Sequence, residues 1–166
     1  MEMQDNMPAS PKEQLRALRI LNSALVIGAA LFAVIAITVT LINGKGAFSI
    51  SDTKKTGVVF LVLSVLLAVF CFYRAITVYK KRMEAIRNGN ESLLLKLNQY
   101  HSALILYLAP CEGAAIFSVI VFFLTGDYKA LIVTAFMVAA MIIKMPARKK
   151  MREELGLNWN EEQEFY

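Results

Sequence analysis

The stretch from Ser102 to Thr125, SALILYLAPCEGAAIFSVIVFFLT, contains one charged residue, Glu112. A helix needs about 20 predominantly apolar residues to cross the hydrocarbon core of a bilayer. The stretch is long enough to do so, and it therefore predicts a membrane-spanning helix. The composition agrees, because 57% of the whole chain is hydrophobic, whereas soluble domains contain about 45–50% apolar residues.

Three more apolar runs accompany this stretch, at 20–42, 57–73 and 130–143, and the last is short. The sequence predicts an all-α membrane protein with four transmembrane helices arranged as two hairpins. Residues 11–155 would form a single domain, between an N-terminal tail at 1–10 and an acidic C-terminal tail at 156–166. The expected spans are about 20–42, 57–79, 102–125 and 128–145.

The basic residues indicate an orientation. Most of the 18 Lys and Arg residues lie before the first run, between the second and third runs, and after the fourth. The positive-inside rule places these segments in the cytoplasm. We therefore expect a multi-pass protein of the inner membrane with both termini cytoplasmic. The middle segment, YRAITVYKKRMEAIR at 73–87, contains many helix formers and predicts a helical cytoplasmic extension between the second and third spans.

Two apolar runs resemble each other. GAALFAVIA at 28–36 aligns without gaps with GAAIFSVIV at 113–121, and six of the nine positions are identical. The alignment favours a parallel internal repeat of two helical hairpins. The alternative is a chance similarity between two apolar helices.

Small residues and prolines mark the expected helix contacts. Small residues four positions apart let helix backbones approach closely in lipid. We expect the first and third spans to pack along such faces, and the fourth span offers a further one. Pro110 is expected to kink its helix, and Pro146 to kink or restart one. The small residues are Ala24 and Gly28, Ala109 and Gly113, and Ala135 and Ala139.

Glu112 has three competing interpretations. An ionised carboxylate at the middle of a bilayer costs about 3 kcal/mol or more, so we expect the neutral acid there. It could be structural and donate to a carbonyl such as that of Leu106, which Pro110 leaves without its helical partner. It could handle a proton or cation, or it could contact a partner helix or a lipid headgroup.

Two resemblances bear on this region. EGAAIFSVIV at 112–121 resembles the ion-binding helix of rotary-ATPase proteolipids, the c-ring subunits, with Glu112 and Phe117 at matching places. That resemblance implies that Glu112 would carry the translocated ion, although here the acid lies on the first helix of its hairpin and not on the second. EGAAIFSVIVFFLTGDY at 112–128 and MPARKKMREELGL at 145–157 resemble small uncharacterised four-span bacterial membrane proteins, which implies the architecture without an activity.

The sequence contains no nucleophile-base pair, phosphate-binding loop or Cys/His cluster, so we expect neither an enzyme nor a bound metal or cofactor. Nucleic acid is not an expected partner, because no aromatic residues interleave with the basic ones. The expected partners are the lipid bilayer and other copies of the chain or other membrane proteins. The leading hypothesis is a structural or accessory membrane subunit. The alternatives are a proton- or cation-handling subunit that uses Glu112 and a small transporter that acts as an oligomer.

Overall fold

The computed structural model describes residues 11–43, 54–89 and 93–156, and these residues are almost entirely helical. No strand occurs within the three described ranges, which confirms the predicted all-α class. The predicted N-terminal tail and all but the first residue of the predicted C-terminal tail lie outside the described residues. The helices are α1 (Pro11–Asn43), α2 (Lys54–Asn88), α3 (Leu93–Thr125), α4 (Lys129–Ile143) and α5 (Arg148–Leu155).

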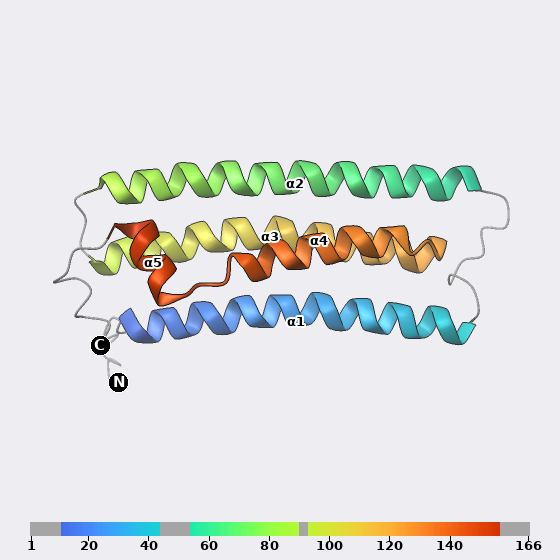
Figure 1. Cartoon of the computed structure of the whole chain (residues 1–166), viewed down its shortest axis with the longest axis horizontal. Coiled ribbons are helices and arrows are strands. Elements are labelled where there is room, and N and C mark those ends of the chain that lie inside the picture. Colours follow the sequence, from blue (N-terminus) through green and yellow to red (C-terminus); the bar gives the residue numbers. More distant parts are fainter. Residues whose placement is uncertain (1–10, 44–53, 90–92, 157–166) are drawn as a thin grey trace, which may run out of the picture.

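The four longer helices lie side by side along the long axis of the molecule, and successive helices run in opposite directions (Figure 1). Three of them, α1, α2 and α3, are long and apolar enough to cross a membrane, whereas α4 is a shorter apolar helix of 15 residues. The short α5 lies across the end of the molecule where α1 and α3 begin and α2 ends. We call this the α5 end.

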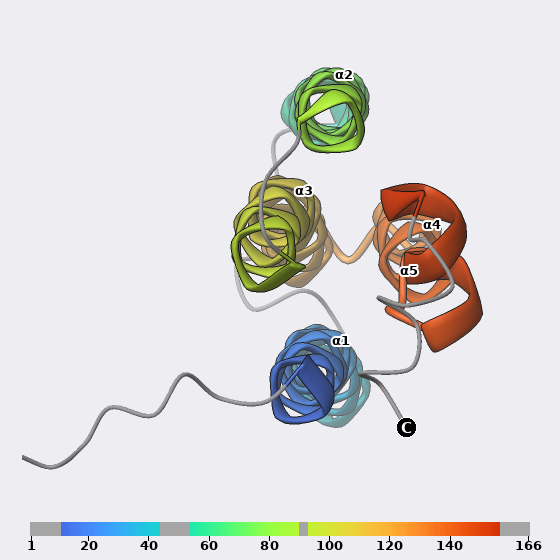
Figure 2. The same ribbon diagram turned by 90° about the vertical axis from the view of Figure 1, so that its left-hand side faces the viewer.

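Helix α3 is the centre of the fold. It contacts α1, α2 and α4, and in the end-on view it lies between α1 and α2 with α4 to one side (Figure 2). Half of the residues in the most apolar 18-residue stretch of α3 are buried. The corresponding fractions are 17% for α1 and 11% for α2. The buried positions of α3 recur every three or four residues from Leu93 to Phe122, so one continuous face packs against its neighbours.

The connection between α3 and α4 is a tight turn, as TGDY at 125–128 predicts. Gly126 has φ of 70°, and its N–H donates to the carbonyl of Phe122 at 2.7 Å, which closes the end of α3. The side chain of Asp127 accepts the N–H of Lys129 at 3.0 Å. This turn directs α4 back along α3.

The helical extension predicted between the second and third spans is present in the described residues. Helix α2 continues to Asn88, well beyond the expected end of its span, and α3 already begins at Leu93. Both extensions carry buried apolar residues, among them Met83 and Leu97. They form the part of the core at the α5 end.

Helix α5 covers that part of the core. Pro146 lies in the non-helical segment between α4 and α5, where the chain changes direction. Met151 and Leu155, one helical turn apart on α5, are each 1% exposed and belong to the main hydrophobic cluster. Gly156, with φ of 61°, follows the last residue of the helix.

The packing predicted for the small residues is wrong within this chain. Helices α1 and α3 do contact each other, but the small residues do not form that contact, because all of them are exposed. A Cβ atom added to Gly28 or Gly113 would meet nothing within 4 Å. The small residues that do belong to the hydrophobic core are others, such as Ala29 of α1 and Ala115 of α3. The exposed small residues are Ala24, Gly28, Ala109, Gly113, Ala135 and Ala139.

Pro110 lies inside α3, which continues through it as one helix from Leu93 to Thr125. The ring removes one backbone donor, so the carbonyl of Leu106 lacks its usual helical partner. The surrounding core holds the helix in place on both sides of this position, because Leu108 and Cys111 are completely buried.

Candidate functional site

The short length of α4 gives Lys144 an unusual position. Fifteen residues at 1.5 Å each make a helix about 22 Å long, whereas the hydrocarbon core is about 30 Å thick. The helix is thus shorter than a full span, and Lys144 is the residue directly after it. The side chain of Lys144 is only 24% exposed, so its charge needs a partner.

Glu154 of α5 is that partner. The ammonium of Lys144 donates to Oε1 of Glu154 at 3.1 Å, and the two side chains are 24% and 21% exposed. The other carboxylate oxygen accepts two tyrosine hydroxyls, from Tyr79 of α2 at 2.6 Å and from Tyr100 of α3 at 3.3 Å. Hydrogen bonds to a charged group are worth about 1.5–3 kcal/mol each, more than those between neutral groups.

Aromatic rings complete the surroundings of the ammonium. The nitrogen of Lys144 lies 4.1 Å from the centre of the Tyr79 ring and 6.0 Å from that of Tyr107, within the range of cation–π attraction. The two tyrosine rings meet edge to face at 5.7 Å. We call Tyr79, Tyr100, Tyr107, Lys144 and Glu154 the Glu154 cluster.

The fold fixes this cluster through α5. Met151 and Leu155 anchor the helix in the core, and Glu154 lies between them in sequence, directed toward α2 and α3. The three tyrosines are themselves buried, so their hydroxyls approach the carboxylate from rigid helices. A single carboxylate therefore connects α2, α3, the end of α4 and α5.

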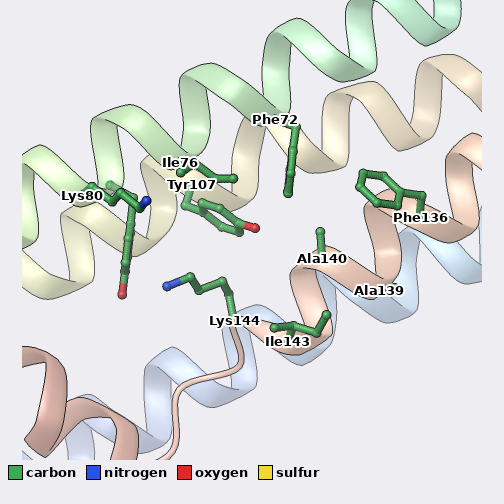
Figure 3. A pocket seen from close by; sticks show the side chains of 10 residues that line it. Phe72, Ile76, Lys80, Tyr107, Phe136, Ala139, Ala140, Ile143 and Lys144 are labelled. Carbon is green, nitrogen blue, oxygen red and sulfur yellow. The ribbon is translucent and has the colours of Figure 1, made fainter.

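An apolar groove begins at this cluster and runs between α2 and α4, with α3 as its floor (Figure 3). Its volume is about 490 Å³. Figure 3 shows Lys80 and Lys144 at one end of the groove and Phe72 and Phe136 at the other. The lining residues are Phe72, Ile76, Tyr79, Lys80, Tyr107, Phe136, Ala139, Ala140, Ile143 and Lys144.

Glu112, the candidate ion-handling residue, does not belong to the groove or the cluster. It is half-buried at the edge of the packed face of α3, between buried Cys111 and exposed Gly113. In the described part of the chain it forms no hydrogen bond or ion pair. The hydrogen bond to the carbonyl of Leu106 that a structural role would use is therefore not formed there.

Sequence reasoning missed the Glu154 cluster. A signal was present, because the fourth apolar run is too short for a full span and ends at a lysine. Nothing in the sequence RKKMREEL at 148–155 distinguishes Glu154 from Glu153. In the structure Glu153 is exposed. The choice depends on the break between α4 and α5, which sets the direction of α5.

Sequence reasoning also gave no special place to Asn22 of α1. It is 1% exposed, and neither its amide nitrogen nor its amide oxygen has a hydrogen-bond partner in the described part of the chain. A small cavity of about 160 Å³ lies beside it, between α1 and the end of α4.

No group of three or more His, Cys, Asp or Glu residues suitable for a metal ion occurs within the described ranges. The chain matches no protein-family model, and it has no significant match among curated protein sequences or solved structures.

Proposed function

We propose that this chain is an integral protein of the inner membrane and serves as a structural or accessory subunit of a membrane assembly. In this proposal α1 to α4 span the bilayer as two hairpins and both termini are cytoplasmic. The observation that carries it is the exposure of Gly28 and Gly113. A helix face in contact only with lipid has no need of small residues four positions apart, whereas close helix–helix contact does.

The same residues support the parallel repeat. Helices α1 and α3 are both 33 residues long, run in the same direction (Figure 1), and expose their glycines at the aligned positions. The second helices of the two hairpins differ, since α2 has 35 residues and α4 has 15. The repeat is therefore proposed for the helices that present the small faces.

Gly28→Leu and Gly113→Leu test the assembly role. Both side chains would enter open space in the isolated chain, so the fold should be retained. We expect each variant to shift the protein, extracted from native membranes in a mild detergent, from a larger complex toward the single chain. Chemical crosslinking and size-exclusion chromatography with light scattering would measure the shift.

Ala30→Leu, at another exposed position of α1, is the matched control and should leave the complex unchanged. A wild-type chain that elutes alone from native membranes would contradict the proposed role. The orientation has a separate test: a reporter active only in the periplasm should be silent when fused after Asn90.

The unpartnered state of Glu112 favours a second candidate, in which this residue handles a proton or a cation. A buried or half-buried carboxyl in a spanning helix is a functional candidate by default, because it is costly to keep there. Glu112 borders the exposed stripe that contains Ala109 and Gly113, so an assembled partner helix would cover it.

Carbodiimide labelling of the protein in vesicles tests this candidate. We expect labelling at Glu112 that falls as the pH rises, because the reagent reacts with the protonated acid. Glu112→Gln should abolish both the labelling and any proton flux, while Glu84→Gln, an exposed site on α2, should change neither. A wild-type protein that never labels at Glu112 would exclude ion handling there.

A further inference from the structure

We propose that the groove between α2 and α4 binds one acyl chain of an anionic phospholipid, with the phosphate held between the ammonium groups of Lys80 and Lys144. This inference does not depend on the subunit role, because the groove is formed within a single chain. It rests on the shape of the groove, on its lining and on the charges at its end.

The shape favours an extended chain that enters from one end. Phe72 and Lys80 are eight positions apart on α2, and Phe136 of α4 lies eight positions before Lys144, so each wall is about 12 Å long. The rings of Phe72 and Phe136 meet edge to face with their centres 5.3 Å apart, and they close the groove at the end away from the lysines. An occupant therefore lies with its apolar end against the phenylalanines.

The lining favours an apolar occupant with a polar head. Apart from the two lysines and the hydroxyls of Tyr79 and Tyr107, the lining side chains are hydrocarbon. The volume of about 490 Å³ lies within the range of ligand-binding clefts, which are mostly apolar with a few placed polar groups. Ala139 and Ala140 leave the space that larger side chains on α4 would fill.

The charges favour an anionic head. Glu154 neutralises Lys144, but Lys80 is exposed and forms no ion pair or hydrogen bond within the described ranges. The end of the groove therefore keeps one uncompensated positive charge. The phosphate of an anionic lipid would balance this positive charge. The phosphate of a zwitterionic lipid is already balanced by the positive charge of its own headgroup. Basic residues at the surface of a membrane attract anionic lipids in this way.

A photoactivatable lipid tests the proposal. The full chain would be placed in nanodiscs of phosphatidylcholine that contain a small fraction of phosphatidylglycerol with a diazirine in one acyl chain. We expect crosslinks on Ile76, Ala139 and Ile143. Their yield should be about fivefold higher than with the same diazirine chain on phosphatidylcholine, because one lysine near an anionic headgroup contributes about 1 kcal/mol. Mass spectrometry of the digested protein would locate and count them.

Two pairs of variants separate the acyl-chain site from the headgroup site. Ala139→Phe fills the groove and should remove these crosslinks, while Ala135→Phe, one turn away and outside the groove, should leave them. Lys80→Gln should reduce the preference for phosphatidylglycerol about fivefold, while Lys81→Gln should not. Lys144 is left intact because it also holds Glu154.

Equal crosslinking with both headgroups, unchanged by Ala139→Phe, would overturn the proposal and leave only the general lipid shell. A co-purifying protein crosslinked to Ala139 in place of lipid would also overturn it, because a partner helix would then occupy the groove.

Discussion

The ammonium of Lys144 lies 3.1 Å from Oε1 of Glu154, and this ion pair ties the end of α4 to α5. The same carboxylate accepts hydrogen bonds from Tyr79 and Tyr100, so α2 and α3 share the connection. Helix α4, the shortest of the four long helices, thereby gains a counter-charge for the lysine at its end from the next helix. The role of α5 in the fold is to bring that counter-charge to Lys144 and to cover the core beside it.

Glu154→Gln removes the counter-charge and keeps the size of the side chain. We expect the free energy of unfolding in detergent micelles to fall by about 2 kcal/mol, because a charged acceptor of three donors becomes a neutral one. Denaturant titration followed by circular dichroism would measure the change. Glu153→Gln alters the neighbouring exposed acid and should have no measurable effect. An equal loss in both variants would show that overall charge, and not the cluster, is responsible.

Tyr79→Phe removes a hydroxyl and keeps the ring against which the ammonium of Lys144 lies. The lost 2.6 Å hydrogen bond to a carboxylate should lower the free energy of unfolding by about 1.5 kcal/mol. Tyr73→Phe, an exposed tyrosine on the same helix, is the control. If Tyr79 acts through Glu154, the effect should be smaller in the Glu154→Gln background, because residues in one network are not additive. Full additivity would contradict that coupling.

Asn22→Leu should stabilise the chain. A buried amide without partners costs about 1–3 kcal/mol, and leucine removes that cost at similar size, so we expect a gain of about 1 kcal/mol. The cavity beside Asn22 leaves room for the branched side chain. Thermal unfolding in micelles would measure the gain, with Ser23→Ala as the neighbouring control. A loss of stability would mean that the amide has a partner in the membrane.

The long helices were predictable because lipid offers no partners to backbone polar groups, so a long apolar run that crosses it pairs these groups within a helix. The expected spans at 20–42, 57–79 and 102–125 lie within α1, α2 and α3. Which face of each helix packs against the other helices was not predictable. In water, polarity marks the outer face of a helix, but in lipid both faces are apolar. The sequence around Gly28 and Gly113 is therefore the same whether these residues contact a neighbouring helix of the chain or face outward.

The polar contacts were the least predictable part of the structure. Glu112 draws attention as a lone acid, yet it has no partner in the described residues, whereas Glu154 is inconspicuous among the charges of α5 and joins four helices. The pairing of Glu154 with Lys144 depends on the bend of the chain at Met145 to Ala147. That bend depends in turn on contacts between residues distant in sequence, such as those of Met151 with the hydrophobic core.

A hydrogen bond between α2 and α3 gives a further test within the apolar part of the molecule. Ser64 and Ser118 are buried, and their hydroxyl oxygens lie 2.7 Å apart. Interhelical hydrogen bonds in membrane proteins are worth about 0.6 kcal/mol on average. Ser118→Ala should lower the free energy of unfolding by about this amount, because the hydroxyl of Ser64 loses its partner on the other helix.

The double variant decides whether the two serines act as a pair. Ser64→Ala in the Ser118→Ala background should cost little more, since the bond is already lost and no unpaired hydroxyl remains. Ser102→Ala is the control, because among the described residues that exposed hydroxyl bonds only to the carbonyl of Asn98 in its own helix. Additive losses would show that each serine is held by a separate contact, and the α2–α3 interface would then depend on apolar packing alone.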